Sequence, residues 1–531
     1  MANIKIPKKL FEKEIGKITE EMKKQIALFG TPLESVDDNE IELEIFPNRP
    51  DLLSYQGFKR SFILFLGKKG KEYKVNKPEK QYSVKIEQSV KSVRPFTACA
   101  IIKNLKFDDD KIKEIIDIQE KLHTTVGRNR KKLAIGIYPL EKITLPITYK
   151  AEDPNKIKFI PLEMDKEITG KQILSQHPAG REYGHLLEKV KRYPVFRDAE
   201  GQVLSLPPII NSELTGKITD ETREVFIECS GFDLEILKKT LNILVTELAD
   251  MQGEIYAMNL HYDKKIVTPD LSPEKMKISI EDAEKLLGIK LSETQVKSLL
   301  SKMGHSYSKG EVESPAYRTD ILHPVDIYED IAIAYGYDNF LAEIPEISTI
   351  GSENPAEIKK RKIAHILAGL SLLEISTHHL SSKNDIKKTG IRGKQTPVLE
   401  SKTEYNILRP ALLVNSLKVL SENTDAKYPQ RIFELGRIFE GIEEKEKLCI
   451  AISGETDFTE IKQTLDYLMR MLDIQYTIEP ATHPAYIDGR CGKILVNGKE
   501  IGFLGEISPS IIKNWNLKMA TVASEIDIKE L

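Results

Sequence analysis

Cysteine is scarce in this chain of 531 residues, which has four, at positions 99, 229, 449 and 491, with no CxxC pair. Isolated cysteines argue against a zinc cluster or a disulfide framework and suit a reducing cytosol. No apolar run approaches the roughly 20 residues of a membrane-spanning helix. The charged start, MANIKIPKKLFEKEIGK, lacks the apolar middle of a secretory signal. We therefore expect a cytoplasmic protein.

Familiar catalytic and nucleotide-binding motifs are also missing. The sequence has no GxxxxGK[ST] phosphate loop, no GxGxxG after a strand, no HExxH and no GxSxG. These absences exclude a P-loop nucleotide site, a dinucleotide site, a zinc-protease site and a hydrolase of the nucleophile-elbow type. No residue of this chain is therefore predicted to bind a nucleotide through a recognisable motif.

Net charge is close to balance, at −3 with 78 lysines and arginines. Such a surface does not attract nucleic acid as a whole, so any RNA binding must come from local patches. The clearest patch is GRNRKK at 127–132, with Arg128, Arg130 and Lys131 as candidate phosphate contacts. A solvated basic loop is the alternative.

The length predicts several domains, because one hydrophobic core does not grow to this size. Four regions separate by pattern, at 1–85, 86–262, 265–345 and 356–531. Strand-like runs such as EVFIECSGFD alternate with amphipathic helices, and the last region reads as an antiparallel sheet covered by helices. The expected fold class is α+β, with mixed helix and sheet domains.

The third region carries clear helix signals. Ser279 is placed to cap a helix that ends at Gly288, and Ser292 with Gln295 predicts a capping box for the next helix. Two short helices followed by a strand make a small module.

Four carboxylates follow in YRTDILHPVDIYEDIAIAYGYD (317–338), namely Asp320, Asp326, Glu329 and Asp330. Pro324 suits the first turn of a helix, which sets the last three acids at i, i+3 and i+4 on one face. Acids in a first turn are stabilised by the helix dipole and need no ion. Three close anions nevertheless repel one another, and Mg²⁺ with oxygen ligands would relieve that repulsion. Both interpretations stay open at this point.

The same stretch closely resembles the B5 domain of the phenylalanyl-tRNA synthetase beta-subunit family, in the pattern D-x5-D-x2-E-[ED]. The resemblance implies a magnesium ion held by all four acids and shared with the alpha subunit. Further motifs agree in order along the chain: FPNRPDLLSYQGFKR (46–60), LHTTVGRNRKKLAIGIY (122–138), VLSLPPIINSELTGKITDETREVFIECSGFD (203–233) and ILRPALLVNSLKVLSENTDAKYPQRIFELGRIFEG (407–441). The length and the ending EIDIKEL resemble the archaeal or eukaryotic form.

The resemblance implies a B3/B4 editing-like domain, a B5 domain and a final domain with the class II synthetase fold. That last domain is inactive in the family, and this sequence agrees, since it has no convincing fRxE stretch and no GxGxxR arginine. Glu434 and Arg437 are expected to pack at an interface and form ion pairs. No residue of this chain is therefore predicted to catalyse aminoacylation.

In the family, the B3/B4 region hydrolyses the ester bond by which tyrosine is wrongly attached to tRNA(Phe). A hydrophobic pocket rejects an added hydroxyl only weakly, whereas a polar partner can select for it. The positions matching the family's pocket are Phe196, Ser205, Asn211, Glu228 and Ser230. Archaeal relatives tend to have Asp-x-Thr-Gly where this chain has Glu228-Cys229-Ser230-Gly231, which implies a reshaped pocket. Strand alternation leaves open that Glu228 is simply an exposed residue.

Taken together, the resemblance implies the beta subunit of phenylalanine–tRNA ligase, which joins phenylalanine to tRNA(Phe) with ATP. The implied partners are an alpha subunit, in an (αβ)2 heterotetramer, and tRNA(Phe). The alternatives are a free-standing aminoacyl-tRNA deacylase and a structural RNA-binding protein.

Overall fold

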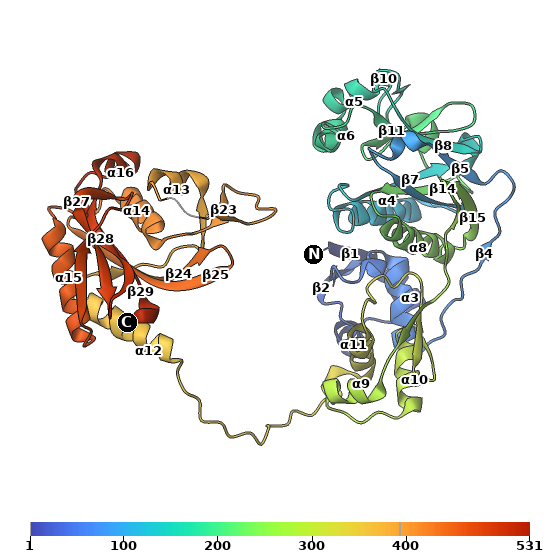
Figure 1. Ribbon diagram of the computed structural model, residues 1–531. Coiled ribbons are helices and arrows are strands. Elements are labelled where there is room, and N and C mark those ends of the chain that lie inside the picture. The colour runs from blue at the N-terminus through green and yellow to red at the C-terminus, as the bar shows by residue number, and fades with distance from the viewer. Residues whose placement is uncertain (1, 392–393) are drawn as a thin grey trace. The chain divides into compact units, whose positions relative to one another are not determined.

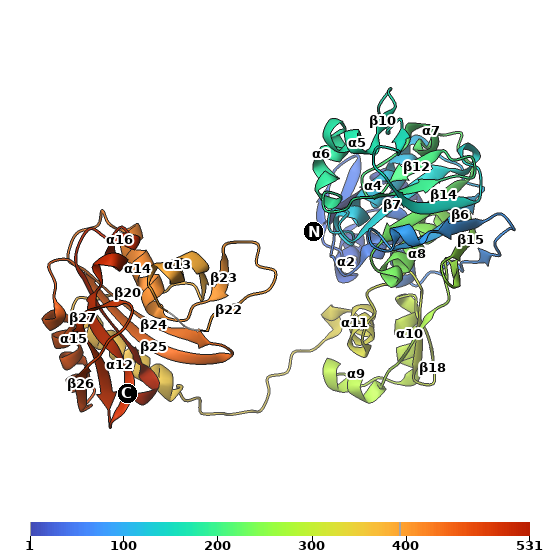
Figure 2. The ribbon, with the colours of Figure 1, turned by 45° about the horizontal axis from the view of Figure 1, so that its top comes forward.

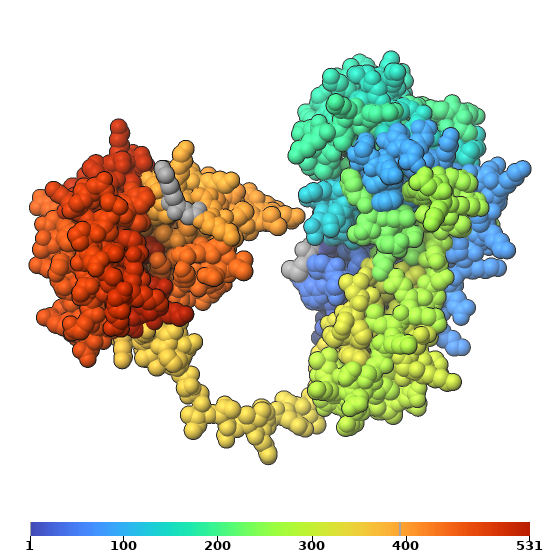
Figure 3. Space-filling view, in the orientation of Figure 1, coloured from blue at the N-terminus to red at the C-terminus, as the bar shows by residue number. Residues whose placement is uncertain are grey.

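The computed structural model describes residues 2–391 and 394–531 (Figure 1). The chain divides into two compact units, Met1–Ile344 and Pro345–Leu531. Residues 345–354, at the start of the second unit, form neither helix nor strand, and the space-filling view shows them as an extended segment (Figure 3). No helix within the described residues is long and apolar enough to cross a membrane.

The first unit begins with a small sheet of order β1-β3-β2. Its elements are β1 (Ala2–Pro7), α1 (Lys8–Glu14), α2 (Glu20–Leu28), β2 (Leu33–Val36), β3 (Glu40–Ile45) and α3 (Tyr55–Phe65). Ser54 caps α3 by accepting from the Gly57 N–H at 3.0 Å. Aromatic rings of α3 then stack inside this part, with the Phe58 and Phe62 centroids 5.1 Å apart. Burial of these rings attaches α3 to the small sheet.

An eleven-stranded sheet forms the middle of the first unit, with the order β13-β12-β11-β8-β5-β15-β6-β14-β7 and with β4 and β16 paired to β15. The strands are β4 (Val75–Asn76), β5 (Ser83–Ile86), β6 (Phe96–Lys103), β7 (Leu133–Pro139), β8 (Ile147–Glu152), β11 (Tyr193–Arg197), β12 (Val203–Leu206), β13 (Ile210–Asn211), β14 (Val225–Gly231), β15 (Glu254–His261) and β16 (Lys265–Thr268). The sheet is curled. Its strands β7 and β12 lie near opposite ends of the order, yet the hydroxyl groups of Tyr138 on β7 and Ser205 on β12 form a hydrogen bond of 2.8 Å.

Helices α4 (Asp109–Thr124) and α8 (Leu234–Asp250) cover one face of this sheet (Figures 1 and 2). Asp108 and Asp233 cap them, which fits the acids seen at both starts. Apolar residues of both helices share one core with inward residues of β6, β7 and β14. The shorter elements β9 (Lys158–Phe159), β10 (Ile168–Thr169), α5 (Gly170–Gln176), α6 (Pro178–Tyr183) and α7 (Glu213–Gly216) lie in the connections.

The middle sheet reaches beyond the expected range 86–262 on both sides. Strand β5 pairs with β15 and β8, and β16 pairs with β15 as far as Met258↔Thr268. The sequence placed β16 in the following region because a strand's partners cannot be read from its own residues. Strand pairing therefore extends the middle domain into both neighbouring regions.

The small module contains helices α9 (Ile280–Leu287), α10 (Glu293–Lys302) and α11 (Pro324–Tyr335) beside a sheet of order β17-β19-β18. The three strands are β17 (Glu274–Lys277), β18 (Ser306–Ser308) and β19 (Glu311–Ser314). Ser279 caps α9, Gly288 ends it at φ 71°, and Ser292 with Gln295 forms the predicted capping box. These local predictions are confirmed, whereas the three-stranded sheet was not predicted.

The second unit is a seven-stranded sheet of order β20-β24-β25-β29-β28-β27-β26, with a smaller sheet β21-β23-β22. Its elements are α12 (Pro355–Gly369), β20 (Leu373–Glu374), β21 (Leu380–Ser382), α13 (Lys383–Lys388), β22 (Thr396–Pro397), β23 (Tyr405–Leu408), α14 (Leu412–Glu422), β24 (Gln430–Glu440), β25 (Glu443–Ser453), α15 (Phe458–Met471), β26 (Tyr476–Pro480), β27 (Tyr486–Val496), β28 (Lys499–Ile507), α16 (Pro509–Asn514) and β29 (Thr521–Asp527). Helix α14 shares one core with the sheet, and α12 and α15 share another. The predicted α+β class is confirmed.

Candidate functional site

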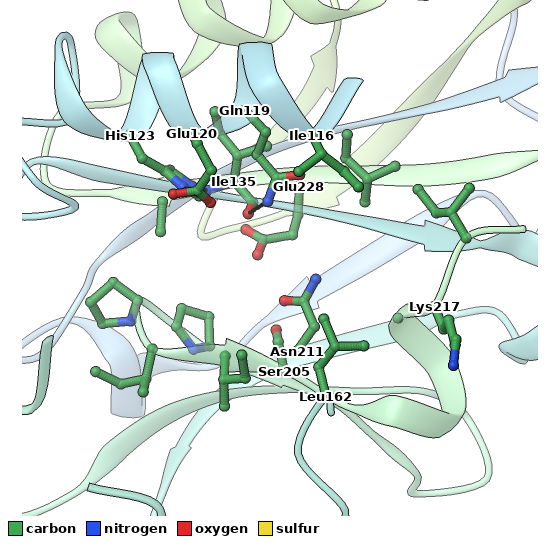
Figure 4. A pocket seen from close by; sticks show the side chains of 18 of the residues that line it. Ile116, Gln119, Glu120, His123, Ile135, Leu162, Ser205, Asn211, Lys217 and Glu228 are labelled. Carbon is green, nitrogen blue, oxygen red and sulfur yellow. Dashed lines mark hydrogen bonds and ion pairs between the residues drawn. The ribbon is translucent and has the colours of Figure 1, made fainter. Parts of the chain in front are cut away.

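A cavity of about 430 Å³ lies where the curled middle sheet meets α4. Figure 4 shows side chains from α4, β7, β12, β13 and β14 converging on it. Its polar lining residues are Gln119, Glu120, His123, Arg130, Glu163, Ser205, Asn211, Glu213, Lys217 and Glu228, and apolar residues such as Ile135 and Leu162 complete the wall. A mostly apolar pocket with a few convergent polar groups is typical of a small-molecule site.

Glu228 is the most deeply buried acid of this cavity. Strand β14 pairs with β6 on one side and β7 on the other, so that Glu228 lies between Cys99 and Gly136 and is 2% exposed. Burial raises the pKa of Glu228 to about 8, and the charge of Arg94 opposes that rise only in part. The interpretation of Glu228 as an exposed strand residue is therefore wrong.

One carboxyl oxygen of Glu228 is left without a partner. Its Oε1 lies 3.3 Å from the Tyr138 hydroxyl, whereas Oε2 has no hydrogen bond from any described residue. Figure 4 shows the carboxyl group directed into the cavity. A buried polar atom without a partner costs free energy, so a ligand group that hydrogen-bonds to it gains that energy back.

The hydroxyl group of Tyr138 contacts all three predicted polar residues of the cavity wall. It lies 2.8 Å from Ser205 Oγ and 3.4 Å from Asn211 Oδ1, in addition to its contact with Glu228. A Cβ at Gly136 would lie 2.1 Å from this hydroxyl. Glycine at 136 therefore keeps the room that the hydroxyl occupies. Tyr138 was not singled out from the sequence, because the contact joins strands that are far apart in the order.

Two predicted pocket residues lie beside the cavity rather than on its wall. Phe196 is fully buried and stacks on Tyr149 with centroids 4.2 Å apart. Ser230 Oγ accepts a hydrogen bond from Arg94 Nε at 3.3 Å. The structure thus brings Ser205, Asn211 and Glu228 onto the wall, and it places Phe196 and Ser230 in the packing behind it.

The basic run at 127–132 turns sharply after α4. Arg128, Asn129 and Arg130 have φ between 49° and 61°, and this left-handed turn sends the Arg130 side chain inward. Its guanidinium contacts Glu120 at 2.8 Å and the carbonyl of Ile209 at 2.9 Å. Arg128 and Lys131 stay exposed. The predicted basic patch is therefore divided between the cavity and the surface.

The sequence also gave no reason to single out Glu120 and His123. Both lie on the last turns of α4. They line the cavity because α4 packs beside β7. The only signal available was their place beside the basic run.

The acidic cluster of the small module is organised by an arginine. Arg318 is 3% exposed and donates to Asp320 at 2.8 Å and to Asp330 at 2.7 Å. His305 Nε2 lies 2.6 Å from Asp330. Burial alone would raise the pKa of Asp330, but Arg318 and His305 hold it well below its usual value. Asp320 and Asp330 are thus already paired within the chain.

The other two acids are more accessible. Asp326 Oδ2 accepts from the N–H groups of Leu322 and His323, each at 2.7 Å, at the start of α11. Glu329 is exposed on the same helix. All four acids of the cluster line one cavity, which also contains Arg49. Among the described residues, no group of three His, Cys, Asp or Glu side chains is arranged to hold a metal ion.

In the second unit, Glu434 is 2% exposed and accepts a hydrogen bond of 2.7 Å from Arg409 Nη1. Thr377 also donates to this carboxylate. Arg437 is paired with Glu444 and Glu446 on the neighbouring strand. Glu434 and Arg437 therefore form ion pairs inside the chain.

The raised pKa of Glu228 makes stability depend on pH. A carboxyl group with a folded pKa above its usual 4.5 keeps a proton that the unfolded state releases, so its contribution to stability falls as pH rises toward about 8. Glu228→Gln does not titrate. We expect the local opening free energy of β14 in the Gln variant to exceed that of wild type increasingly over this window, by up to about 1.4 kcal/mol per pH unit.

Hydrogen exchange of the peptide covering 225–231, measured by mass spectrometry and corrected for intrinsic rates, checks this expectation. Glu235→Gln removes an exposed carboxylate at the start of α8 and is the matched control. A difference between Glu228→Gln and wild type that does not change with pH would contradict the assignment.

Three family models match the chain. They are the B3/4 domain at 81–247, the tRNA synthetase B5 domain at 276–337 and the phenylalanyl tRNA synthetase beta chain CLM domain at 342–528. The cavity lies in the first match and the acidic cluster in the second.

Curated relatives extend this similarity over nearly the whole chain. The phenylalanine–tRNA ligase beta subunit of Pyrococcus abyssi is 40% identical, covering 91% of this chain and 90% of the relative. That of Archaeoglobus fulgidus is 36% identical, covering 97% and 96%. An N-terminal fragment of the phenylalanyl-tRNA synthetase beta-subunit from Pyrococcus horikoshii superposes with a TM-score of 0.60 at 38% identity, covering 63% of this chain and 99% of the fragment. This chain belongs to the phenylalanine–tRNA ligase beta-subunit family.

Proposed function

We propose that this chain acts with a catalytic alpha subunit in a phenylalanine–tRNA ligase, which joins phenylalanine to tRNA(Phe) with ATP. The observation that carries the proposal is the family match along 91% of the chain. The second unit supports a non-catalytic role, because the buried carboxylate of Glu434 is already paired with Arg409. The working assembly is an (αβ)2 heterotetramer in the cytoplasm.

The cavity of the middle sheet is the proposed proofreading site. There, water cleaves the ester bond of tyrosyl-tRNA(Phe), so that its OH joins the tyrosine carbonyl carbon and its proton goes to the ribose oxygen. The unpartnered Glu228 Oε2 supports this role, because a phenol can hydrogen-bond to it and a phenylalanine ring cannot. With a pKa of about 8, Glu228 is mostly neutral at pH 7, which lowers the cost of holding it in a buried pocket.

tRNA contacts are assigned to the exposed part of the basic loop, Arg128 and Lys131. These side chains offer their charge to phosphates, while Arg130 is held in the cavity wall. A free-standing deacylase would use the same cavity without a partner, and a structural RNA-binding protein would use the loop alone.

Magnesium is proposed to be bound at a site shared with the alpha subunit. Glu329 and the free oxygen of Asp326 are the accessible carboxylates, and Mg²⁺ typically takes one or two carboxylates and keeps its waters. Asp320 and Asp330 would act behind them by fixing Arg318 and the start of α11.

The subunit role is tested by aminoacylation. We expect the purified chain alone to form no Phe-tRNA(Phe), because its second unit lacks the motifs that hold ATP, and we expect activity when the cognate alpha subunit is added. Incorporation of labelled phenylalanine into tRNA measures this. Aminoacylation by the chain alone, or no effect of the alpha subunit, would refute the proposal.

Proofreading is tested in the alpha–beta complex with preformed tyrosyl-tRNA(Phe). Glu228→Ala should slow its hydrolysis at least about tenfold, because a hydrogen bond in a buried site is lost. Formation of Phe-tRNA(Phe) should stay unchanged. Glu235→Ala, an exposed acid of the same domain, is the control. Equal hydrolysis by wild type and Glu228→Ala would leave Glu228 with a structural role only.

The shared metal site is tested by elemental analysis of the purified complex. Asp326→Asn together with Glu329→Gln should remove bound magnesium, because both accessible carboxylates are lost. Glu281→Gln and Asp282→Asn, which change two acids at the start of α9, form the matched control. Magnesium retained at the wild-type level by the first pair would exclude these two ligands.

A further inference from the structure

The cavity has a second acidic group, which the proofreading proposal does not use. Glu120 lies on α4, and Figure 4 shows it on the same side of the cavity as His123. Its Oε1 accepts a hydrogen bond of 2.8 Å from Arg130 Nη2 and lies 3.1 Å from His123 Nδ1. Its side chain remains 46% exposed. Two neighbours thus fix the position of this carboxylate without covering it.

His123 has a hydrogen-bond pattern that settles its proton position. The backbone N–H of Ile135 donates to His123 Nε2 at 2.7 Å, so Nε2 must carry a lone pair. In the neutral ring the hydrogen is then on Nδ1, which donates to Glu120. Burial lowers the pKa of His123 and keeps the ring neutral. Because Nε2 is already occupied, His123 positions Glu120 and does not accept a proton from water.

Arg130 fixes Glu120 from the other side. Its Nη1 donates to the carbonyl of Ile209, and its guanidinium lies 4.4 Å from the ring centroid of Tyr183. The arginine is therefore immobilised by backbone and aromatic contacts. Both donors converge on Glu120 Oε1, and no described residue donates to Oε2. One oxygen of a rigidly held carboxylate remains available to a ligand.

Two carboxyl groups of the cavity, those of Glu120 and Glu228, differ in charge. Partial burial alone would raise the pKa of Glu120, but the hydrogen bond from His123 and the charge of Arg130 lower it overall, so the group is ionised near neutral pH. Glu228 is mostly neutral there. Environments that separate the pKa values of two nearby groups assign them different tasks. Of the other two acids of the wall, Glu213 is already bonded to Lys217 and to the Glu163 N–H, and Glu163 is exposed.

A tyrosyl ester has matching asymmetry, since its side chain ends in a neutral phenol and its α-carbon bears an ammonium group. We propose that the Glu120 carboxylate binds the α-ammonium group of the aminoacyl ester, and that Arg130 and His123 position it for this contact. The inference rests on the proposed proofreading function and specifies which end of the substrate each acid receives.

The test compares two ligands that differ only in the amine. Tyrosinamide carries the ammonium group, and 3-(4-hydroxyphenyl)propanamide lacks it. Each ligand is titrated into the full chain, and binding is monitored by calorimetry or NMR. Tyrosinamide should bind about tenfold more tightly than the des-amino ligand, because it gains a charge-assisted hydrogen bond. Glu120→Gln should remove this preference and leave the affinity of the des-amino ligand unchanged.

Asp117→Asn, which alters an exposed acid of the same helix, is the control and should keep the preference. An equal loss of affinity for both ligands in Glu120→Gln would show that Glu120 only supports the cavity wall, and this would overturn the proposal. No preference in wild type, or no binding of either ligand, would also overturn it. If the preference behaves as expected but tyrosyl-tRNA is not hydrolysed, the proofreading function fails and the ammonium contact stands.

Discussion

The closure of the middle sheet on itself is the constraint on which the candidate site depends. Tyr138 and Ser205 come from strands near opposite ends of the sheet, yet their hydroxyl groups hydrogen-bond. The curl removes water from Glu228, and this loss of solvation raises its pKa. Without that closure, β14 would expose its acid at an open sheet and the cavity would have no second wall.

Some features of the fold follow from short stretches of sequence. The caps at Ser279 and Ser292 and the proline start of α11 involve residues no more than a few positions apart, so they are predictable from spacing. The strand β14 was likewise visible as the β-branched and aromatic run EVFIECSGFD. Its neighbours in the sheet were not visible, because they are determined by packing across the whole domain.

The site residues divide in the same way. Ser205, Asn211 and Glu228 were found through the family resemblance, whereas the depth of Glu228 required both of its neighbouring strands. The sequence predicts Arg130 to be a phosphate contact or part of a solvated loop. Its place in the cavity wall could not be predicted, because no local pattern indicates three successive left-handed residues. The acidic cluster looked like mutual repulsion in the sequence, but Arg318 lies between two of its members and offsets that repulsion.

The pairing of β15 shows how the domain built on the middle sheet is joined to its neighbours. This strand contacts β4 and β5, which precede the cavity-forming residues, and β16, which follows them. An excised fragment cut at 86 and 262 would leave β15 with unsatisfied backbone groups along much of its length, and such an edge readily pairs with other chains. An excised fragment that keeps the whole middle sheet must therefore include the chain from before Val75 to beyond Thr268.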